Sequence, residues 1–181
     1  FFFISTGGIT ISGGEILAQP EFTRAVLRNC RAECMHTAIE TSFFAPWETI
    51  KSILPYVNLA FVDMKFFSND LHKQYTGVDN ELIKQNLLAT NELEDKFQLV
   101  IRTPIIPGLN DSEEELCKIG EFCTKLKKLS YVQLLPYHKL GTATYEKLGR
   151  TYALPDIKSP TPDQMAGYVK IIERYVENVI F

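Results

Sequence analysis

The chain has 181 residues, of which 45% are apolar and 23% charged, and its formal net charge at pH 7 is -3. This length and apolar content suffice for a buried core, so we predict a globular protein with a single domain over residues 1–181. Basic residues are scattered among acidic ones, which argues against a nucleic-acid partner. The apolar run at residues 1–4 is too short for a membrane span or a signal peptide.

Alternating patterns along the chain predict an α/β fold. Apolar runs rich in β-branched residues, typical of parallel strands buried on both faces, alternate with helical patterns. The predicted strands are residues 8–12, 36–41, 58–65, 97–104 and 131–136. The predicted helices are residues 21–34, 46–54, 81–93, 112–129 and 162–179, and residues 139–160 form the one long irregular stretch.

The cysteines do not predict a metal site. The chain has four of them, and nothing else indicates a small disulfide-bonded secreted domain, so we expect a reducing, cytoplasmic setting. A cluster-binding loop needs three closely spaced thiols, but the residue that follows Cys30 and Cys34 at the required spacing is Thr37. We therefore expect all four to serve in helix packing: Cys30, Cys34, Cys117 and Cys123.

Polar side chains gather where the predicted strands end, which is the face where α/β barrels build their active sites. After the first strand come Gly13, Gly14 and Glu15. The glycines allow backbone to approach a ligand closely, and Glu15 with the neighbouring backbone groups could hold an ammonium. The same residues are also consistent with a tight turn between a strand and a helix, because so short a motif is weak.

Two oppositely charged residues end the third predicted strand. Asp63 and Lys65 are two positions apart and therefore face the same side of the strand. Such a pair suits a zwitterion, with Lys65 toward a carboxylate and Asp63 toward a cation or a metal. The alternative is a salt bridge between the two or a solvated rim charge.

Arg102 and His138 are the other polar candidates. Arg102 follows an apolar run, so it needs either a ligand carboxylate or an internal acid as its partner, and by itself it favours the internal salt bridge. His138 follows the last strand and could stack on or hydrogen-bond a ligand ring, although a lone histidine is more often structural.

Six segments, in this order, match one family pattern. They are residues 7–15, 36–41, 62–65, 75–77, 102–111 and 134–141, within a match that runs from Gly7 to about Tyr152. The ordered set resembles the radical S-adenosylmethionine (SAM) activating enzymes of glycyl radical enzymes, the family of pyruvate formate-lyase activating enzyme. The ordered set is far more specific than any one of its pieces.

The resemblance implies a partial parallel (β/α) barrel of the radical SAM type, in which SAM lies against a four-iron four-sulfur cluster. An electron donor such as flavodoxin or ferredoxin would drive reductive cleavage of SAM. The resulting 5′-deoxyadenosyl radical would take a hydrogen atom from a glycine of a partner such as pyruvate formate-lyase. On this interpretation Gly13, Gly14 and Glu15 contact the methionyl ammonium, and Lys65 contacts the carboxylate.

The resemblance also implies roles for the remaining candidates. Glu40, Thr41 and Asp63 would lie near the carboxylate end of SAM, where some relatives hold a monovalent cation. Arg102 and His138 would complete the pocket around the ribose and the adenine.

The chain departs from the family pattern in three places. Glu40 stands where relatives commonly carry Asp, and Ile16 stands where the pattern usually has Pro. The Cys-x-x-x-Cys-x-x-Cys loop of the family is absent, and without three thiolates no cluster can be bound. We therefore interpret the chain as a fragment that lacks the first strand or strands of the barrel and the cluster loop, and we expect it alone to be inactive.

Two other functions remain open from the sequence. A barrel lyase or aldolase would use Lys65 to form a Schiff base, with Asp63 or His138 moving protons. A binding module without catalysis would grip a partner through the open edge of an incomplete sheet.

Overall fold

The computed structural model describes residues 7–139, 147, 149, 154 and 156–181. The apolar run at residues 1–4 lies outside these residues. So do most of the predicted irregular stretch at residues 139–160 and the last two residues of the matched segment 134–141.

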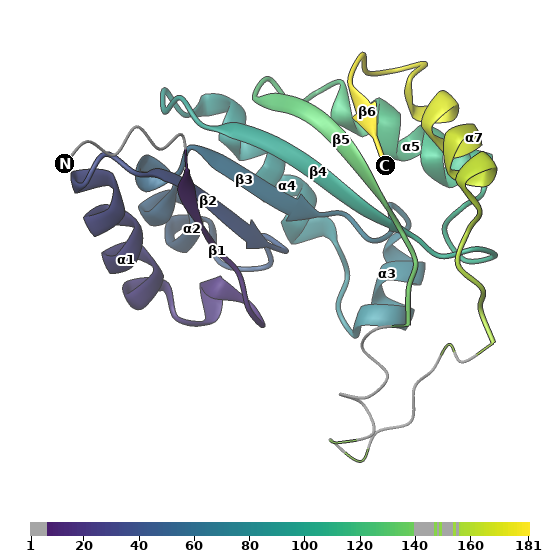
Figure 1. Cartoon of the computed structure of the whole chain (residues 1–181), viewed down its shortest axis with the longest axis horizontal. Coiled ribbons are helices and arrows are strands. Elements are labelled where there is room, and N and C mark those ends of the chain that lie inside the picture. Colours follow the sequence, from purple (N-terminus) through teal and green to yellow (C-terminus); the bar gives the residue numbers. More distant parts are fainter. Residues whose placement is uncertain (1–6, 140–146, 148, 150–153, 155) are drawn as a thin grey trace.

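The described strands form one six-stranded parallel sheet, which confirms the predicted fold class (Figure 1). The strand order follows the sequence, and the strands are β1 (Gly8–Ile11), β2 (His36–Thr41), β3 (Leu59–Asp63), β4 (Gln98–Ile105), β5 (Leu129–Pro136) and β6 (Val179–Ile180). The first five match the predicted strands to within two residues at each end. β6 was missed, because two residues are too few to make a pattern.

Six α-helices are described: α1 (Pro20–Ala32), α2 (Trp47–Ile53), α3 (Asn69–Thr76), α4 (Glu81–Ala89), α5 (Glu113–Cys123) and α7 (Pro162–Ile172). Short 3-10 turns follow β1, α2 and α4: Ile16–Ala18, Leu54–Tyr56 and Thr90–Glu92. The hydroxyl of Thr161 and the side chain of Gln164 form a capping box that begins α7, so the predicted start of this helix is confirmed.

The sequence placed several helix ends too late and missed α3 entirely. α5 ends at Cys123 rather than at residue 129, because the chain turns there and Leu129 already begins β5. Cys34 lies beyond α1 at a positive φ of 57° and is exposed, so its predicted place in helix packing is wrong. Cys123, by contrast, is buried in the core as expected.

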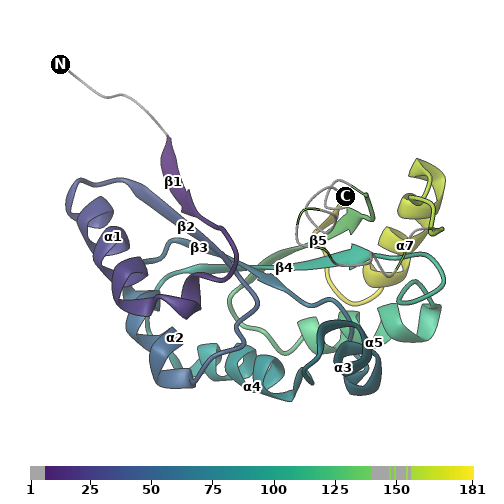
Figure 2. The ribbon, with the colours of Figure 1, turned by 90° about the horizontal axis from the view of Figure 1, so that it is seen from below.

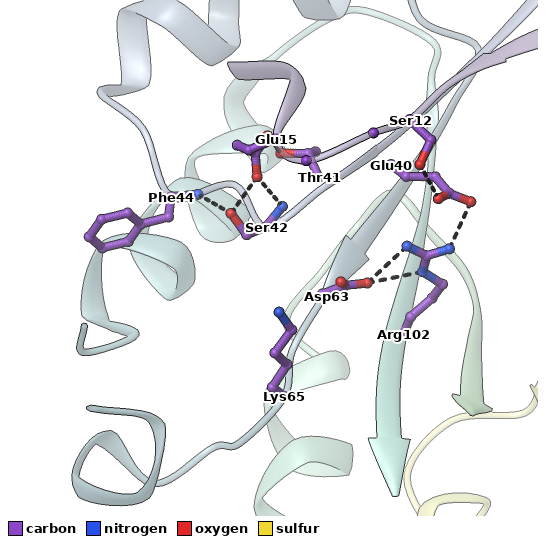
Figure 3. Close-up of a pocket in the computed structure, with 11 residues that line it drawn as sticks. Ser12, Glu15, Glu40, Thr41, Ser42, Phe44, Asp63, Lys65 and Arg102 are labelled. Carbon is purple, nitrogen blue, oxygen red and sulfur yellow. Dashed lines mark hydrogen bonds and ion pairs between the residues drawn. The ribbon is translucent and has the colours of Figure 1, made fainter. Parts of the chain in front are cut away.

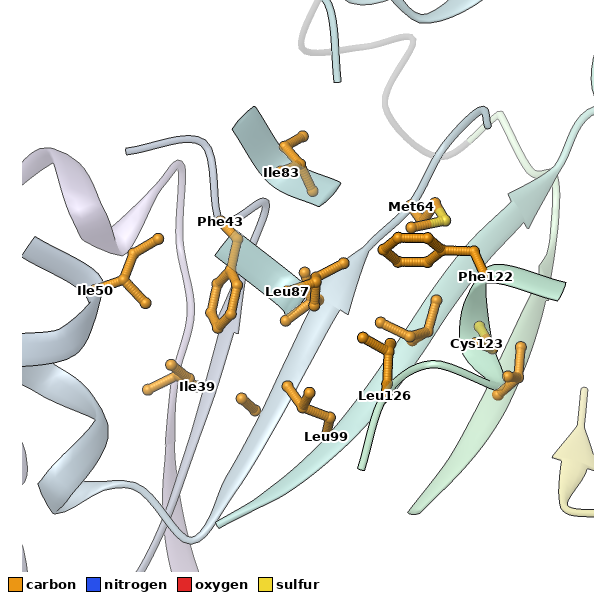
Figure 4. Packing of buried hydrophobic residues seen from close by; sticks show 14 of the residues in the cluster. Ile39, Phe43, Ile50, Met64, Ile83, Leu87, Leu99, Phe122, Cys123 and Leu126 are labelled. Carbon is orange, nitrogen blue, oxygen red and sulfur yellow. The ribbon is translucent and has the colours of Figure 1, made fainter. Parts of the chain in front are cut away.

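The helices that connect the strands cover one face of the sheet. Figure 2 shows α1, α2, α4 and α5 along the same side of the strands. The core lies between these layers, where Ile39, Leu87 and Leu99 are almost fully buried (Figure 4). Burial on this scale, about 1.5–3 kcal/mol for each large aliphatic side chain, is what holds the layers together.

The sheet is open. β1 and β6 are its two outer strands, and they are not paired with each other in the described part of the chain, so the barrel is partial. All five strand pairs run parallel, which brings the carboxyl ends of the strands to the same edge of the sheet. Among the described helices, none has the length and apolar character needed to cross a membrane.

Candidate functional site

A cavity of about 420 Å³ lies at the carboxyl ends of β1 to β4 (Figure 3). Its volume falls within the range of roughly 300–1,000 Å³ that is usual for small-molecule sites. The lining is mostly polar and comes from four strand ends and the loops after them: Ser12, Gly13, Gly14, Glu15, Glu40, Thr41, Ser42, Phe44, Asp63, Lys65 and Arg102. The structure thus brings together eight of the nine residues that the sequence selected.

The carboxylate of Glu15 is fully engaged within the protein. One oxygen accepts from the hydroxyl of Thr41 at 2.7 Å and the backbone N–H of Leu17 at 3.0 Å. The other accepts from the backbone N–H and hydroxyl of Ser42, at 2.9 and 2.6 Å. Burial acts to raise the pKa of Glu15, but these hydrogen bonds, led by those from Ser42, outweigh it and lower the pKa. Glu15 therefore ties the loop after β1 to the end of β2.

Arg102 is the partner of two acidic residues, so the predicted internal salt bridge is confirmed. Its guanidinium lies 2.9 Å from a carboxylate oxygen of Glu40 and 3.0 Å from one of Asp63. The other oxygen of Glu40 accepts from the hydroxyl of Ser12 at 2.6 Å. The Ser12 hydrogen bond, partly opposed by burial and aided by Arg102, lowers the pKa of Glu40.

The three residues named for a possible monovalent cation already have partners within the protein. The guanidinium of Arg102 already lies between the carboxylates of Glu40 and Asp63, and the hydroxyl of Thr41 is directed to Glu15. Within the described residues, no group of three His, Cys, Asp or Glu side chains is arranged to hold a metal ion.

Lys65 differs from the other charged groups of the cavity. Its side chain extends from the segment after β3 into the cavity, and its ammonium has no ion-pair or hydrogen-bond partner among the residues that the structure describes (Figure 3). The proposed salt bridge between Lys65 and Asp63 is absent there, because Asp63 pairs with Arg102 instead. A cation directed into a cavity without a counter-ion is available to an anionic group of a ligand.

Gly13 and Gly14 leave open space beside their backbone, where a ligand could approach closely. A Cβ atom added to Gly13 or Gly14 would meet nothing within 4 Å. Gly13 has a φ of 143°, which a residue with a side chain rarely adopts. An open edge of backbone, a cation with no counter-ion among the described residues and a cavity of suitable volume are what a small zwitterionic ligand would need.

His138 stands apart from the other candidates. It follows β5, its side chain is exposed, and it does not line this cavity. The sequence also missed three lining residues, Ser12, Ser42 and Phe44. The two serines could have been found by position, because each is adjacent to a predicted site residue, at Gly13 and Thr41.

The fold and the site together define a class: an open parallel α/β barrel with a polar small-molecule site at the carboxyl ends of its strands. The family model of the radical SAM superfamily matches residues 2–119, well over half of the chain. The chain therefore belongs to the radical SAM superfamily.

Curated relatives of this chain include activating enzymes of two different enzymes. The isethionate sulfite-lyase activating enzyme of Nitratidesulfovibrio vulgaris is 42% identical over 157 residues, which are 87% of this chain and 50% of that protein. The 4-hydroxyphenylacetate decarboxylase activating enzyme of Clostridium scatologenes is 38% identical over 176 residues, 97% of this chain and 55% of that protein. The chain spans about half the length of the curated relatives it matches.

A solved structure of similar length matches this chain almost from end to end. A crystallised domain of pyruvate-formate lyase-activating enzyme from Bacteroides vulgatus superposes with a TM-score of 0.79 and 28% identity. The superposition covers 97% of this chain and 99% of that one. The predicted resemblance to activating enzymes of glycyl radical enzymes is thus confirmed by sequence and by fold.

Proposed function

We propose that this chain supplies the SAM-binding part of a radical SAM enzyme that activates a glycyl radical enzyme. The observation that carries the proposal is Lys65, a cation that has no partner in the part of the chain that the structure describes and that lines a polar cavity of the size of a small-molecule site. The relatives support it, because both curated proteins described above are activating enzymes by name. Lys65 and the backbone at Gly13 and Gly14 would hold SAM, which beside a reduced four-iron four-sulfur cluster would supply the radical chemistry needed to take a hydrogen atom from the partner's glycine.

In this proposal each side chain of the cavity has a separate task. Lys65 binds the carboxylate of SAM, and the backbone at Gly13 and Gly14 receives the methionyl ammonium. Glu15 acts mainly by holding this backbone in place, since its four hydrogen bonds are already made within the protein. The ion pair of Arg102 and Glu40 forms part of the cavity wall. His138 would meet the nucleoside from outside the cavity.

The proposed cluster needs thiolates that this chain does not supply in the family's spacing, since its cysteines are 30, 34, 117 and 123. The coding sequence in frame before Phe1 is therefore the first thing to read. We expect it to encode Cys-x-x-x-Cys-x-x-Cys after an apolar strand. A start codon close to Phe1 with no such loop before it would refute the radical chemistry.

The biochemical test uses the full-length protein encoded by the reading frame that contains this chain. With a reconstituted cluster, reduced flavodoxin or ferredoxin and SAM, it should release 5′-deoxyadenosine. With its glycyl radical enzyme added, a glycine-centred radical should appear in the electron paramagnetic resonance spectrum. Pyruvate formate-lyase is the partner to try first, followed by the enzymes that the relatives activate. Residues 1–181 alone should release no 5′-deoxyadenosine.

The structure gives less support to a Schiff-base lyase. Such a lysine needs an apolar pocket that favours the neutral amine. Lys65 instead opens into a cavity that also contains the carboxylates of Glu40 and Asp63. Borohydride trapping of a carbonyl substrate on Lys65 would overturn this preference.

A further inference from the structure

The segment that carries Lys65 is bound by buried side chains from elsewhere in the chain. Asn110, which is fully buried, donates from its amide nitrogen to the backbone carbonyl of Lys65 at 2.7 Å. It also donates to the carbonyl of Pro104 at 2.7 Å, and its oxygen accepts from the N–H of Ile106 at 2.7 Å. Asn110 therefore joins the segment after β3 to the end of β4.

Two more buried side chains bind the next three residues. Asn80 donates to the carbonyls of Phe66 and Phe67, at 2.6 and 3.1 Å. The carboxylate of Glu115 accepts from the backbone N–H groups of Phe67 and Ser68. Asn80 is 2% exposed and Glu115 is 5% exposed. Five backbone groups between residues 65 and 68 are thus held by three side chains, which we call the β3 clamp: Asn80, Asn110 and Glu115.

Burying the polar side chains of the clamp is unfavourable unless they are well hydrogen-bonded, which indicates that the geometry of the clamp matters. A carboxylate as buried as that of Glu115 is stable only with good hydrogen bonds, here helped by its position in the first turn of α5. The amide oxygen of Asn80 is buried with no partner among the described residues. The amide nitrogen of Asn80 nevertheless satisfies two backbone carbonyls after β3, while its own buried oxygen stays unpaired among these residues.

We propose that the β3 clamp positions Lys65 for the carboxylate of SAM. The inference rests on the proposed function, in which Lys65 binds that carboxylate. The Lys65 ammonium has no partner among the described residues, so the placement of its backbone is what directs the long side chain. A flexible lysine loses rotamer freedom when it is fixed, and a backbone held in one position limits this loss to the side chain. Asn80, Asn110 and Glu115 are positioning residues, because none of them lines the cavity.

The test compares two ligands that differ in the group that Lys65 would bind. S-adenosylhomocysteine contains the amino-acid carboxylate, whereas 5′-methylthioadenosine lacks the amino-acid part and keeps the adenosine. Dissociation constants of both are measured by titration calorimetry on the full-length protein with its cluster, for the wild type and for Asn110→Ala. We expect Asn110→Ala to weaken S-adenosylhomocysteine about tenfold, equivalent to about 1.4 kcal/mol, and 5′-methylthioadenosine less than about twofold.

Asn91→Ala is the matched control. Asn91 also bridges two backbone groups, donating to the carbonyl of Lys125 at 2.7 Å and accepting from the N–H of Lys127 at 2.8 Å. This bridge lies before β4 and β5, at the end of the sheet opposite the cavity. Its loss should leave the ratio of the two dissociation constants unchanged. Asn80→Ala, which also removes the unsatisfied oxygen, is the second clamp variant. If Asn110→Ala does not fold, the ratio of dissociation constants for Asn80→Ala tests the positioning role of the clamp.

Lys65→Ala separates the two ways in which the idea can fail. If Lys65→Ala leaves the ratio of the dissociation constants at the wild-type value, the proposed role of Lys65 is wrong. If Lys65→Ala changes the ratio and the folded clamp variants do not, the role of Lys65 stands and the positioning inference is overturned. Equal weakening of both ligands by a clamp variant would also overturn it, because a general loss of structure affects both ligands alike.

Discussion

Replacing Glu15 by glutamine should destabilise the protein by about 2 kcal/mol. The substitution keeps the shape of the side chain and one oxygen, which can still accept from Leu17 and Thr41. The new NH₂ group then faces the N–H and hydroxyl of Ser42, and only the hydroxyl can rotate to accept. Hydrogen bonds to a charged group contribute about 1.5–3 kcal/mol each. Because Glu15 is only partly buried, we take a value near the lower end of this range for the loss of the hydrogen bonds from Ser42.

Urea denaturation measures this loss directly. With a slope near 2 kcal/mol/M, the midpoint for Glu15→Gln should fall by about 1 M. Ser42→Ala and the double variant complete a cycle, in which we expect a coupling energy of about 1 kcal/mol. Glu21→Gln is the control, since Glu21 is exposed and, within the described part of the chain, pairs only with Arg24; it should change stability by less than about 0.5 kcal/mol. A Glu15→Gln protein as stable as the Glu21→Gln protein would refute the argument.

Three further predictions concern the site and the core. Arg102→Ala removes the shared partner of Glu40 and Asp63. Because both acids keep some solvent contact, the free energy of unfolding measured in urea should fall by about 1–3 kcal/mol. Arg102→Lys should restore only part of this loss. The pKa values of Glu15 and Glu40 lie below the ordinary 4.5, so their contribution to stability is complete above that pH and is lost as the pH falls through the lowered values. Thermal melts from pH 6 to 3 should show this decline in stability, and the Glu15→Gln protein should show a smaller decline. Phe43→Ala should cost about 3–5 kcal/mol, because Phe43 is fully buried, and a loss under about 1 kcal/mol would contradict its place in the core.

The sequence predicted the sheet well because its strands carry the plainest physical signal. The run at β4 is largely apolar, and β2 carries three β-branched residues at Thr37, Ile39 and Thr41; most residues of both strands are buried, which leaves few other structures open to them. α3 left no such signal, since its sequence is mostly polar and only His72 is buried. Its boundaries come instead from the hydroxyl cap of Ser68 and the left-handed Gly77, features that are easily overlooked beside a weak periodicity.

The positions of the site residues were more predictable than their partners. Parallel strands place their carboxyl ends together, so polar residues such as Glu40 and Asp63 had to meet there. Which of them would pair with which depended on distances across three strands. The register sets Asp63 directly beside Arg102, and this neighbour relation leaves Lys65 without a counter-ion among the residues described by the structure. No sequence pattern states that register, since it results from packing of the whole sheet.

The charges of the cavity complement those of the ligand that the proposal assigns to it. Three carboxylates line it, from Glu15, Glu40 and Asp63, against the two cations of Arg102 and Lys65. The cavity therefore carries one net negative charge when all five groups are ionised, and SAM, with its ammonium, sulfonium and carboxylate, carries one net positive charge. Lys65 nevertheless presents a positive group within this negative cavity. Such a site favours a net cation that also carries a carboxylate, which distinguishes SAM from simple cations and from simple anions.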